Sequence, residues 1–243
     1  QDVDSYQRLA RVIIVNGATV EKQLKLMKEA FAANPNNRPL YESIIWSSEA
    51  TGDEAIYVPA FEFAIEAFPG DEGFFKDYAE TLVKRGSFKK AQEVYRRFIA
   101  AAPTNEDACI AALACLNRQM ADVSQRTVLL DECLQNIGGS VALYDARLAL
   151  IAESFGELKR RRPSEKVSAA QIAYVDAQEA VHSDRTVLHV VKAKILKKGR
   201  GVPAALAFVN EKLPAAPDSA DLHVVKAALL DSQKKRREAI ELL

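Results

Sequence analysis

The chain has 243 residues, and 49% of them are apolar, so a buried core can form and disorder along the whole chain is excluded. Its 33 basic and 33 acidic residues give a formal net charge of zero, which argues against a domain whose overall basic charge binds nucleic acid. The longest apolar run, from Ala108 to Leu116, is far shorter than the roughly 20 residues that a membrane-spanning helix needs.

Prolines mark a repeat in the first half of the chain. The similar phrases AFAANPNN, AIEAFPGD and FIAAAPTN contain prolines spaced 34 residues apart: Pro35, Pro69 and Pro103. Farther along, the six residues from Leu188 to Ala193 recur unchanged as Leu222 to Ala227, again at an offset of 34, and Pro217 follows the first copy. A period shared by prolines and by a repeated hexapeptide indicates a repeat architecture.

This period divides the chain into units of 34 residues. The complete units are 4–37, 38–71, 72–105, 106–139 and 186–219, and a shortened unit covers 220–243. The interval 140–185 has 46 residues, which is one unit with 12 additional residues. We place this insertion at 156–169, GELKRRRPSEKVSA, because the segment interrupts the apolar pattern between two helical stretches.

Each unit is predicted to form two helices, as 72–105 illustrates. The apolar face of its first helix consists of Phe75, Tyr78, Ala79 and Leu82. Gly86 ends that helix, and the apolar face of the second consists of Ala91, Val94, Tyr95, Phe98 and Ile99. Pro103 ends the second helix, because proline lacks a backbone donor and clashes with the preceding turn.

This pattern resembles the tetratricopeptide repeat, which has a small residue midway along its first helix, glycine at the turn, alanine and an aromatic residue in its second helix, and a closing proline. Unit 72–105 matches it at Ala79, Gly86, Ala91, Tyr95 and Pro103. The last two units match in part, at Ala193, Gly199, Ala205, Pro217, Ala227 and Ala239. The resemblance implies an all-α fold: a right-handed superhelix, or solenoid, of about six helix-turn-helix repeats.

Several positions depart from the tetratricopeptide pattern. Larger residues stand where small ones are expected: Arg11, Gln23, Ile45 and Tyr57. Unit 106–139 ends in Gly138-Gly139 instead of a closing proline. The degenerate units also resemble the half-a-tetratricopeptide class of RNA-processing scaffolds, which favours aromatic residues in the first helix; here these are Trp46, Phe75 and Tyr78.

Charge divides the predicted solenoid into regions. Residues 1–140 hold 20 acidic and 15 basic residues, a net charge of −5, whereas residues 141–243 hold 13 acidic and 18 basic residues, a net charge of +5. We therefore expect acidic, aromatic-rich repeats in 1–139, a repeat with a basic inserted loop in 140–185, and basic repeats in 186–243, the last of them truncated.

The resemblance also implies a concave groove, lined by defined positions of the first helices. The candidate groove residues are Arg8, Glu42, Trp46, Glu49, Lys76, Glu80 and Asn117. Trp46 is the only tryptophan, and it is either an exposed anchor for a basic, apolar partner segment or a core residue packed between hairpins.

Some members of the family hold a carboxylate in a clamp of lysine, asparagine and arginine side chains. The corresponding positions in 4–105 are Arg8, Val12, Ser43, Gly73 and Asp77, of which only Arg8 suits an anion. Carboxylate-clamp binding is therefore not expected in these units.

Three basic runs follow one another in the last units. One run lies in the predicted insertion, Lys159, Arg160, Arg161 and Arg162. The other two are predicted at turns between paired helices: Lys197, Lys198 and Arg200, and Lys234, Lys235, Arg236 and Arg237. Stacked units would align the three runs along one basic edge, which either contacts RNA or an acidic partner or is simply solvated. No aromatic residues are interleaved with the runs, which weakens the case for base stacking.

The sequence contains no Cys-X-X-Cys or HExxH motif, no phosphate-binding loop and no glycine-rich dinucleotide-binding fingerprint. We interpret His182, His189 and His223 as helix-surface or core residues, because stacked helices would hold the latter two about 8–10 Å apart, too far for one metal ion. The triad residue types in His182-Ser183-Asp184 are only neighbours in sequence. We expect no enzymatic activity, no cofactor and no metal site.

Three cysteines, Cys109, Cys115 and Cys133, do not suggest a disulfide framework. We expect buried thiols in a reducing compartment, and therefore a cytoplasmic location. The chain begins without methionine and ends in EAIELL, within a helical pattern, so we expect it to be a piece of a longer protein.

The sequence as a whole predicts a non-enzymatic scaffold that binds a peptide or helix of a partner protein in its groove, as one subunit of a larger complex. The alternative is a scaffold associated with RNA or ribonucleoprotein through the basic edge.

Overall fold

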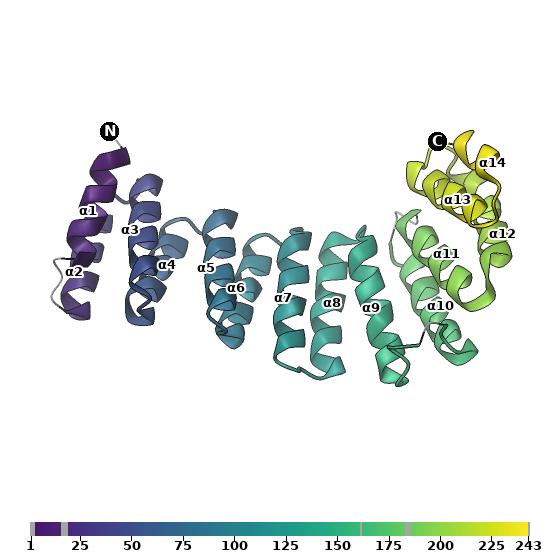
Figure 1. The fold of residues 1–243 in the computed structure, drawn as a ribbon, viewed down its shortest axis with the longest axis horizontal. Coiled ribbons are helices and arrows are strands. Elements are labelled where there is room, and N and C mark those ends of the chain that lie inside the picture. The colour runs from purple at the N-terminus through teal and green to yellow at the C-terminus, as the bar shows by residue number, and fades with distance from the viewer. Residues whose placement is uncertain (1–2, 16–18, 161, 183–185, 243) are drawn as a thin grey trace. The chain divides into compact units, whose positions relative to one another are not determined.

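The computed structural model describes residues 3–15, 19–160, 162–182 and 186–242, and within these ranges it contains 14 α-helices, one short 3-10 helix and no strand (Figure 1). The all-α prediction is confirmed. The chain forms two compact units, residues 1–102 and residues 103–243. No helix in the described part of the chain is long and apolar enough to cross a membrane.

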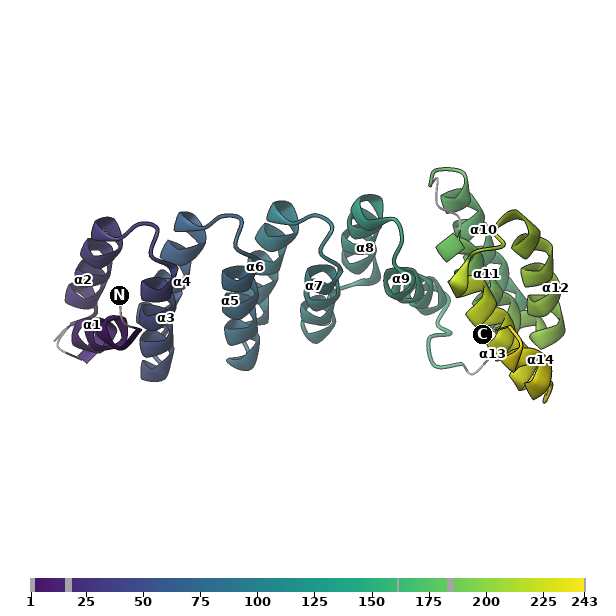
Figure 2. The same cartoon turned by 90° about the horizontal axis from the view of Figure 1, so that it is seen from above.

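The first unit consists of three helical hairpins. Its helices are α1 (Val3–Val15), α2 (Val20–Ala33), α3 (Arg38–Thr51), α4 (Glu54–Ala67), α5 (Glu72–Lys84) and α6 (Phe88–Ala101). Figure 2 shows the first helices of the hairpins, α1, α3 and α5, on one side and α2, α4 and α6 on the other. α1 packs on α3, and α4 packs on both α3 and α5.

A short proline motif joins successive hairpins. The residue before each proline is the C-cap of the preceding helix: Asn34, Phe68, Ala102 and Ala216. All four have a φ between −141° and −128° and a ψ between 57° and 74°. This backbone geometry is not helical, because proline disfavours helical geometry in the residue before it. Two residues after each proline, a side-chain oxygen accepts a backbone N–H of the next helix: Asn37, Asp71, Asn105 and Ser219. The motif stops one helix and starts another, which confirms the hairpin boundaries that the prolines predict.

Aromatic stacking joins neighbouring helices in the first unit. Phe31 of α2 stacks on Tyr41 of α3, with ring centroids 3.9 Å apart. Phe61 of α4 stacks on Tyr78 of α5 at 4.9 Å. Such pairs stabilise a core by about 1 kcal/mol beyond the area they bury. Tyr57, which departs from the small-residue pattern, is almost completely buried and lies beneath the Arg85 guanidinium, 4.6 Å from the ring centroid.

The second unit continues the hairpin pattern. Its elements are α7 (Glu106–Arg118), α8 (Val123–Ile137), α9 (Val141–Ser154), α10 (Glu165–Glu179), α11 (Thr186–Arg200), α12 (Val202–Lys212), the 3-10 helix η1 (Leu213–Ala215), α13 (Ala220–Ser232) and α14 (Arg236–Ile240). The inserted loop ends earlier than predicted, because the Ser164 hydroxyl accepts the backbone N–H of Val167 and starts α10. Residues 165–169 are therefore helical.

The turn predicted at Gly199 is misplaced by two residues. Gly199 lies inside α11, and the turn is at Gly201, which has a φ of +92°. A Cβ atom on Gly199 would lie 2.7 Å from the Ser168 Oγ and 3.2 Å from the Ser168 Cβ of α10. Glycine at 199 thus permits close packing of two helices, and Lys197, Lys198 and Arg200 belong to the last helical turn instead of a loop.

Gly199→Ala is expected to lower the free energy of unfolding by about 1–2 kcal/mol, since the overpacking against Ser168 exceeds the gain in helix propensity. In a Ser168→Gly background the same substitution should be neutral or stabilising, because the crowding atoms are gone. Urea unfolding of the four variants of this cycle measures both effects. Equal changes in the two backgrounds would contradict the packing explanation.

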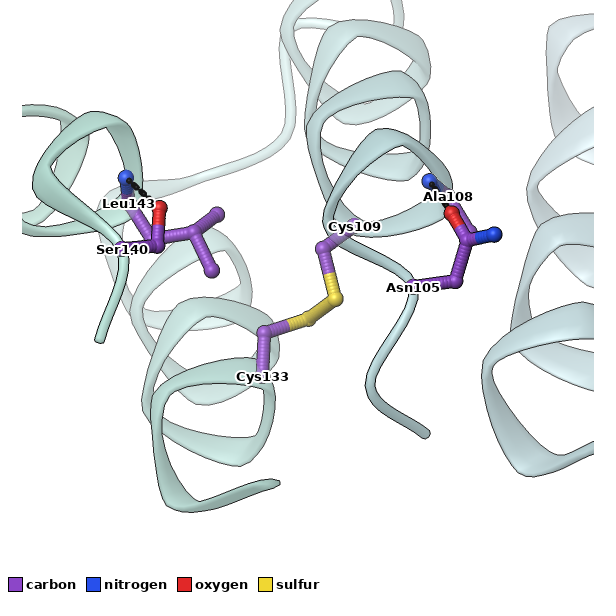
Figure 3. Close-up of a disulfide and its surroundings, with 6 residues drawn as sticks. All are labelled: Asn105, Ala108, Cys109, Cys133, Ser140 and Leu143. Atoms are coloured by element: carbon purple, nitrogen blue, oxygen red, sulfur yellow. Dashed lines mark hydrogen bonds between the residues drawn. A yellow bond between two sulfur atoms is a disulfide. The ribbon is translucent and has the colours of Figure 1, made fainter. Parts of the chain in front are cut away.

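The cysteine prediction is wrong for two of the three residues. Cys109 of α7 and Cys133 of α8 form a disulfide, with their Cα atoms 6.2 Å apart, and both are fully buried (Figure 3). Cys115 is free and buried, and burial raises the pKa of its thiol. The pairing arises because the α7–α8 hairpin brings together residues 24 positions apart. Disulfides persist in oxidising environments, so the cysteines do not support the predicted cytoplasmic location.

Candidate functional site

A hollow of about 210 Å³ lies in the first unit, and its lining comes from α3, α4 and α5. We call it the Trp46 hollow. Its lining residues are Glu42, Ile45, Trp46, Glu49, Phe61, Phe74, Asp77, Glu80, Thr81 and Lys84. One helical face of α3 and one of α5 therefore form its two walls, and α4, the helix between them in sequence, contributes Phe61.

The floor of the hollow is apolar and Trp46 stands at its edge. Ile45, Phe61 and Phe74 are buried and belong to the core. Trp46, the next residue after Ile45 on α3, is 59% exposed. The alternative in which Trp46 packs in the core between hairpins is therefore wrong. An exposed indole next to an apolar floor presents a large, rigid contact area to a partner.

The remaining lining is predominantly acidic. Four carboxylates, those of Glu42, Glu49, Asp77 and Glu80, accompany one ammonium group, that of Lys84. The Thr81 hydroxyl donates a hydrogen bond to the Glu49 carboxylate. Partial burial, and then the nearby Glu80 carboxylate, raise the pKa of Asp77 above its usual value. The hollow thus favours an incoming positive charge.

Arginine side chains brace α3 and α5 at both ends. At the start of α3, Arg38 forms an ion pair with Glu42 and another with Asp71, whose Oδ2 lies 2.6 Å from the Arg38 Nε. The hydrogen bond from Arg38 lowers the pKa of Asp71. At the end of α3, Arg85 donates to the carbonyl oxygens of Glu49, at 3.0 Å, and Gly52, at 3.2 Å. These bonds hold the walls of the hollow in place before any partner arrives, which lowers the cost of binding.

The structure brings four of the seven candidate groove residues together in this hollow: Glu42, Trp46, Glu49 and Glu80. Arg8 on α1 and Lys76 on α5 are exposed outside its lining. Asn117 lies in the second unit, where its Oδ1 accepts a hydrogen bond of 3.2 Å from Arg126. Asn117 therefore positions Arg126, which also pairs with Glu153 of α9 at 2.5 Å.

Sequence reasoning missed three polar lining residues of α5, Asp77, Thr81 and Lys84, and the apolar Phe74. They lie three or four residues from Glu80 or from one another, which is the spacing of one helical face. Extending the helical period from Glu80 would have found them. Of the two candidate groove residues on α5, only Glu80 lies on the face that lines the hollow.

Two of the three basic runs meet at a second hollow, entirely within the second unit. We call it the basic hollow. Its lining residues, from one cavity of about 270 Å³ and an adjoining one of about 570 Å³, are Asp145, Leu148, Ala149, Ala152, Glu157, Leu158, Arg160, Arg162, Pro163, Gln171, Lys194, Ile195, Lys197 and Lys198. Lys159 and Arg200 are exposed and are sequence neighbours of lining residues, but they are not part of the lining. Arg161 lies outside the described residues.

The third basic run does not contribute to the basic hollow. Lys234 and Lys235 lie in the turn between α13 and α14, as predicted, and Arg236 and Arg237 are the first residues of α14. Two of these residues pair with local carboxylates: Lys235 with Glu238 at 3.3 Å and Arg236 with Asp231 at 3.3 Å. Two of the three runs therefore line the basic hollow, and the alignment of all three along one basic edge stays a prediction.

The histidines lie apart from both hollows. The His189 Nε2 is 3.8 Å from a Glu179 carboxylate oxygen, and the His223 Nε2 is 2.8 Å from the carbonyl oxygen of Pro217. Ser183 and Asp184, which follow His182, lie outside the described residues. Within the described residues, no group of three or more histidine, cysteine, aspartate or glutamate side chains is arranged to hold a metal ion.

No protein-family model matches the sequence, and no curated protein matches it. Among solved structures, a tetratricopeptide repeat protein from Parabacteroides merdae is 14% identical, with 98% of this chain and 91% of that chain covered and a TM-score of 0.42. The protein YrrB, described as a TPR protein with an unusual peptide-binding site, is 14% identical over 75% of this chain and 88% of its own, with a TM-score of 0.36. PilF of Pseudomonas aeruginosa is 10% identical over 93% and 97%, with a TM-score of 0.42.

These likenesses concern the fold alone, at identities of 10–14%. Within the described residues, the chain is an all-α protein of helical hairpins, most of which follow a period of 34 residues, and the same proline and capping motif separates hairpins at four places. The sequence pattern of these hairpins resembles the tetratricopeptide repeat.

Proposed function

We propose that the chain is a non-enzymatic scaffold that binds a partner protein, as one subunit of a larger complex. The observation that carries this proposal is the Trp46 hollow, in which a 59% exposed tryptophan stands over an apolar floor and four carboxylates. An open hollow of this kind suits a side chain or helix of another protein better than a small substrate, which enzymes enclose in a drier pocket.

The lining specifies the chemistry of the bound segment. Lysine or arginine side chains would pair with Asp77 and Glu80, since Glu42 is already paired with Arg38, and would lie against the face of Trp46, as cations do on aromatic rings. Leucine-sized side chains would contact the floor at Ile45 and Phe74. We therefore infer a partner segment that is basic and apolar, in the form of a peptide or a helix.

Trp46→Ala is expected to weaken the binding of such a segment by about tenfold or more, since an aromatic anchor at the centre of an interface commonly carries this much affinity. The probe is a synthetic peptide of lysine and leucine, without aromatic residues, in a helical pattern. Because Trp46 is the only tryptophan, its own fluorescence reports binding in the unaltered chain through a shift to shorter wavelength as water leaves the indole.

Phe155→Ala is the matched control for Trp46→Ala, because Phe155 is also an exposed aromatic residue but lies in the second unit. It should leave peptide affinity unchanged, and a peptide with glutamate in place of lysine should not shift the Trp46 emission. Equal affinity of the Trp46→Ala variant and the unaltered chain, or an unchanged emission at saturating peptide, would contradict the proposal.

A further inference from the structure

The inserted loop between α9 and α10 forms a defined wall of the basic hollow. The end of α9 is closed by Gly156, with a φ of +72°, and by a hydrogen bond of 2.9 Å from the Glu157 N–H to the Ala152 carbonyl. The Glu157 carboxylate accepts the backbone N–H of Ser164 at 2.8 Å and pairs with Arg160 at 3.2 Å. One carboxylate thus joins the two ends of the loop, and this backbone hydrogen bond lowers the pKa of Glu157.

Positive charge at the basic hollow exceeds the negative charge available to neutralise it. Its two carboxylates are already paired, Asp145 with Lys194 at 2.7 Å and Glu157 with Arg160. Arg162, Lys197 and Lys198 have no carboxylate partner among the residues that the structure describes. Among the described residues, Lys197 donates to a neutral group, the Ser232 hydroxyl, at 3.3 Å.

The surface between these cations is aliphatic. Leu148 of α9 and Ile195 of α11 are buried and form the floor. Ala149 and Ala152 leave space above them on α9. Leu158, in the inserted loop, is 51% exposed at the rim. The lining contains no aromatic side chain among the described residues, so nothing there would stack on a nucleic-acid base.

We propose that the basic hollow binds an acidic, amphipathic segment of a partner protein. Carboxylates of the segment pair with Arg162, Lys197 and Lys198, and its apolar side chains contact Leu158 and the aliphatic floor. The charges steer the segment to the hollow, and the aliphatic contacts distinguish a protein segment from RNA, which would use the cations alone. This surface is separate from the Trp46 hollow and takes a segment of opposite charge.

The test compares three fluorescently labelled probes on the full chain by anisotropy at about 150 mM salt. They are a peptide of about 15 residues with glutamate and leucine in a helical pattern, a scrambled peptide of the same composition, and an oligouridine RNA of similar length.

The double variant Arg162→Glu with Lys198→Glu should weaken binding of the patterned peptide by about tenfold or more. The control, Arg236→Glu with Arg237→Glu, changes the net charge equally outside the hollow and should change the affinity by less than about twofold.

Leu158→Ser separates the two classes of ligand, and its exposed side chain makes the substitution safe for folding. It should weaken binding of the patterned peptide by about tenfold, because one leucine contact is lost, while leaving any RNA binding unchanged.

The proposal is overturned if the patterned peptide does not bind, if the scrambled peptide binds equally well, or if RNA binds and the peptide does not. It is also overturned if both hollow variants bind the peptide like the unaltered chain. Trp46→Ala should leave this binding intact, so the two hollows are tested independently.

Discussion

Removal of the Cys109–Cys133 disulfide is expected to lower the free energy of unfolding of the second unit by about 3 kcal/mol. The bond closes a loop across 24 residues, and a crosslink of that size removes conformational entropy from the unfolded chain. Both sulfur atoms are buried between α7 and α8, so Cys109→Ala with Cys133→Ala also leaves a small loss of packing. Hydrogen exchange of the α7 and α8 amides, with and without a reducing agent, measures the change.

Cys115→Ala provides the control for the disulfide. Cys115 is buried but free, so this variant should keep its sensitivity to reducing agent, whereas the double variant should lose it. Exchange in α3 and α5, which belong to the other unit, should not respond to the reducing agent. Equal protection of α7 and α8 in the oxidised and reduced chains would show that the bond contributes little to stability.

Phe61→Ala is expected to cost about 3–5 kcal/mol of unfolding free energy, the largest effect of any single substitution predicted for this chain. Phe61 is fully buried in α4, stacks on Tyr78 and forms part of the floor of the Trp46 hollow. Its truncation removes both the ring contacts and the support beneath the hollow. Urea unfolding followed by Trp46 fluorescence measures the effect, because the reporter stands at the edge of the same hollow.

Two variants check that the cost comes from the cavity left by Phe61. Phe61→Leu should retain part of the lost stability, because leucine refills some of the volume. Phe155→Ala removes an exposed aromatic residue and should change stability by less than about 0.5 kcal/mol. A cost for Phe61→Ala similar to that of Phe155→Ala would mean that the stacked core does not stabilise the first unit.

The sequence predicted the residues of the Trp46 hollow more completely than it predicted the structure of the basic hollow. Trp46 and its neighbours Glu42 and Glu49 lie on one face of a single helix, and the groove positions that the resemblance implies had already grouped them. Asp77 and Lys84 lie on another hairpin, and whether they face Trp46 depends on the rotation of α5 against α4. For the basic hollow, the sequence predicted only the basic runs. It did not predict the loop wall at Leu158 or the ion pair of Asp145 with Lys194, because both depend on contacts between separate helices.

The sequence alone determined the helical class, the 34-residue period and most hairpin boundaries, because proline geometry and helix capping act over a few neighbouring residues. Only the tertiary structure decided the Cys109–Cys133 bond, the exposure of Trp46 and the helical position of Gly199. Each of these depends on how closely and at what rotation two helices pack. Two packed helices bring into contact residues that are tens of positions apart in the sequence. The spacing of residues within one helix carries no information about that contact.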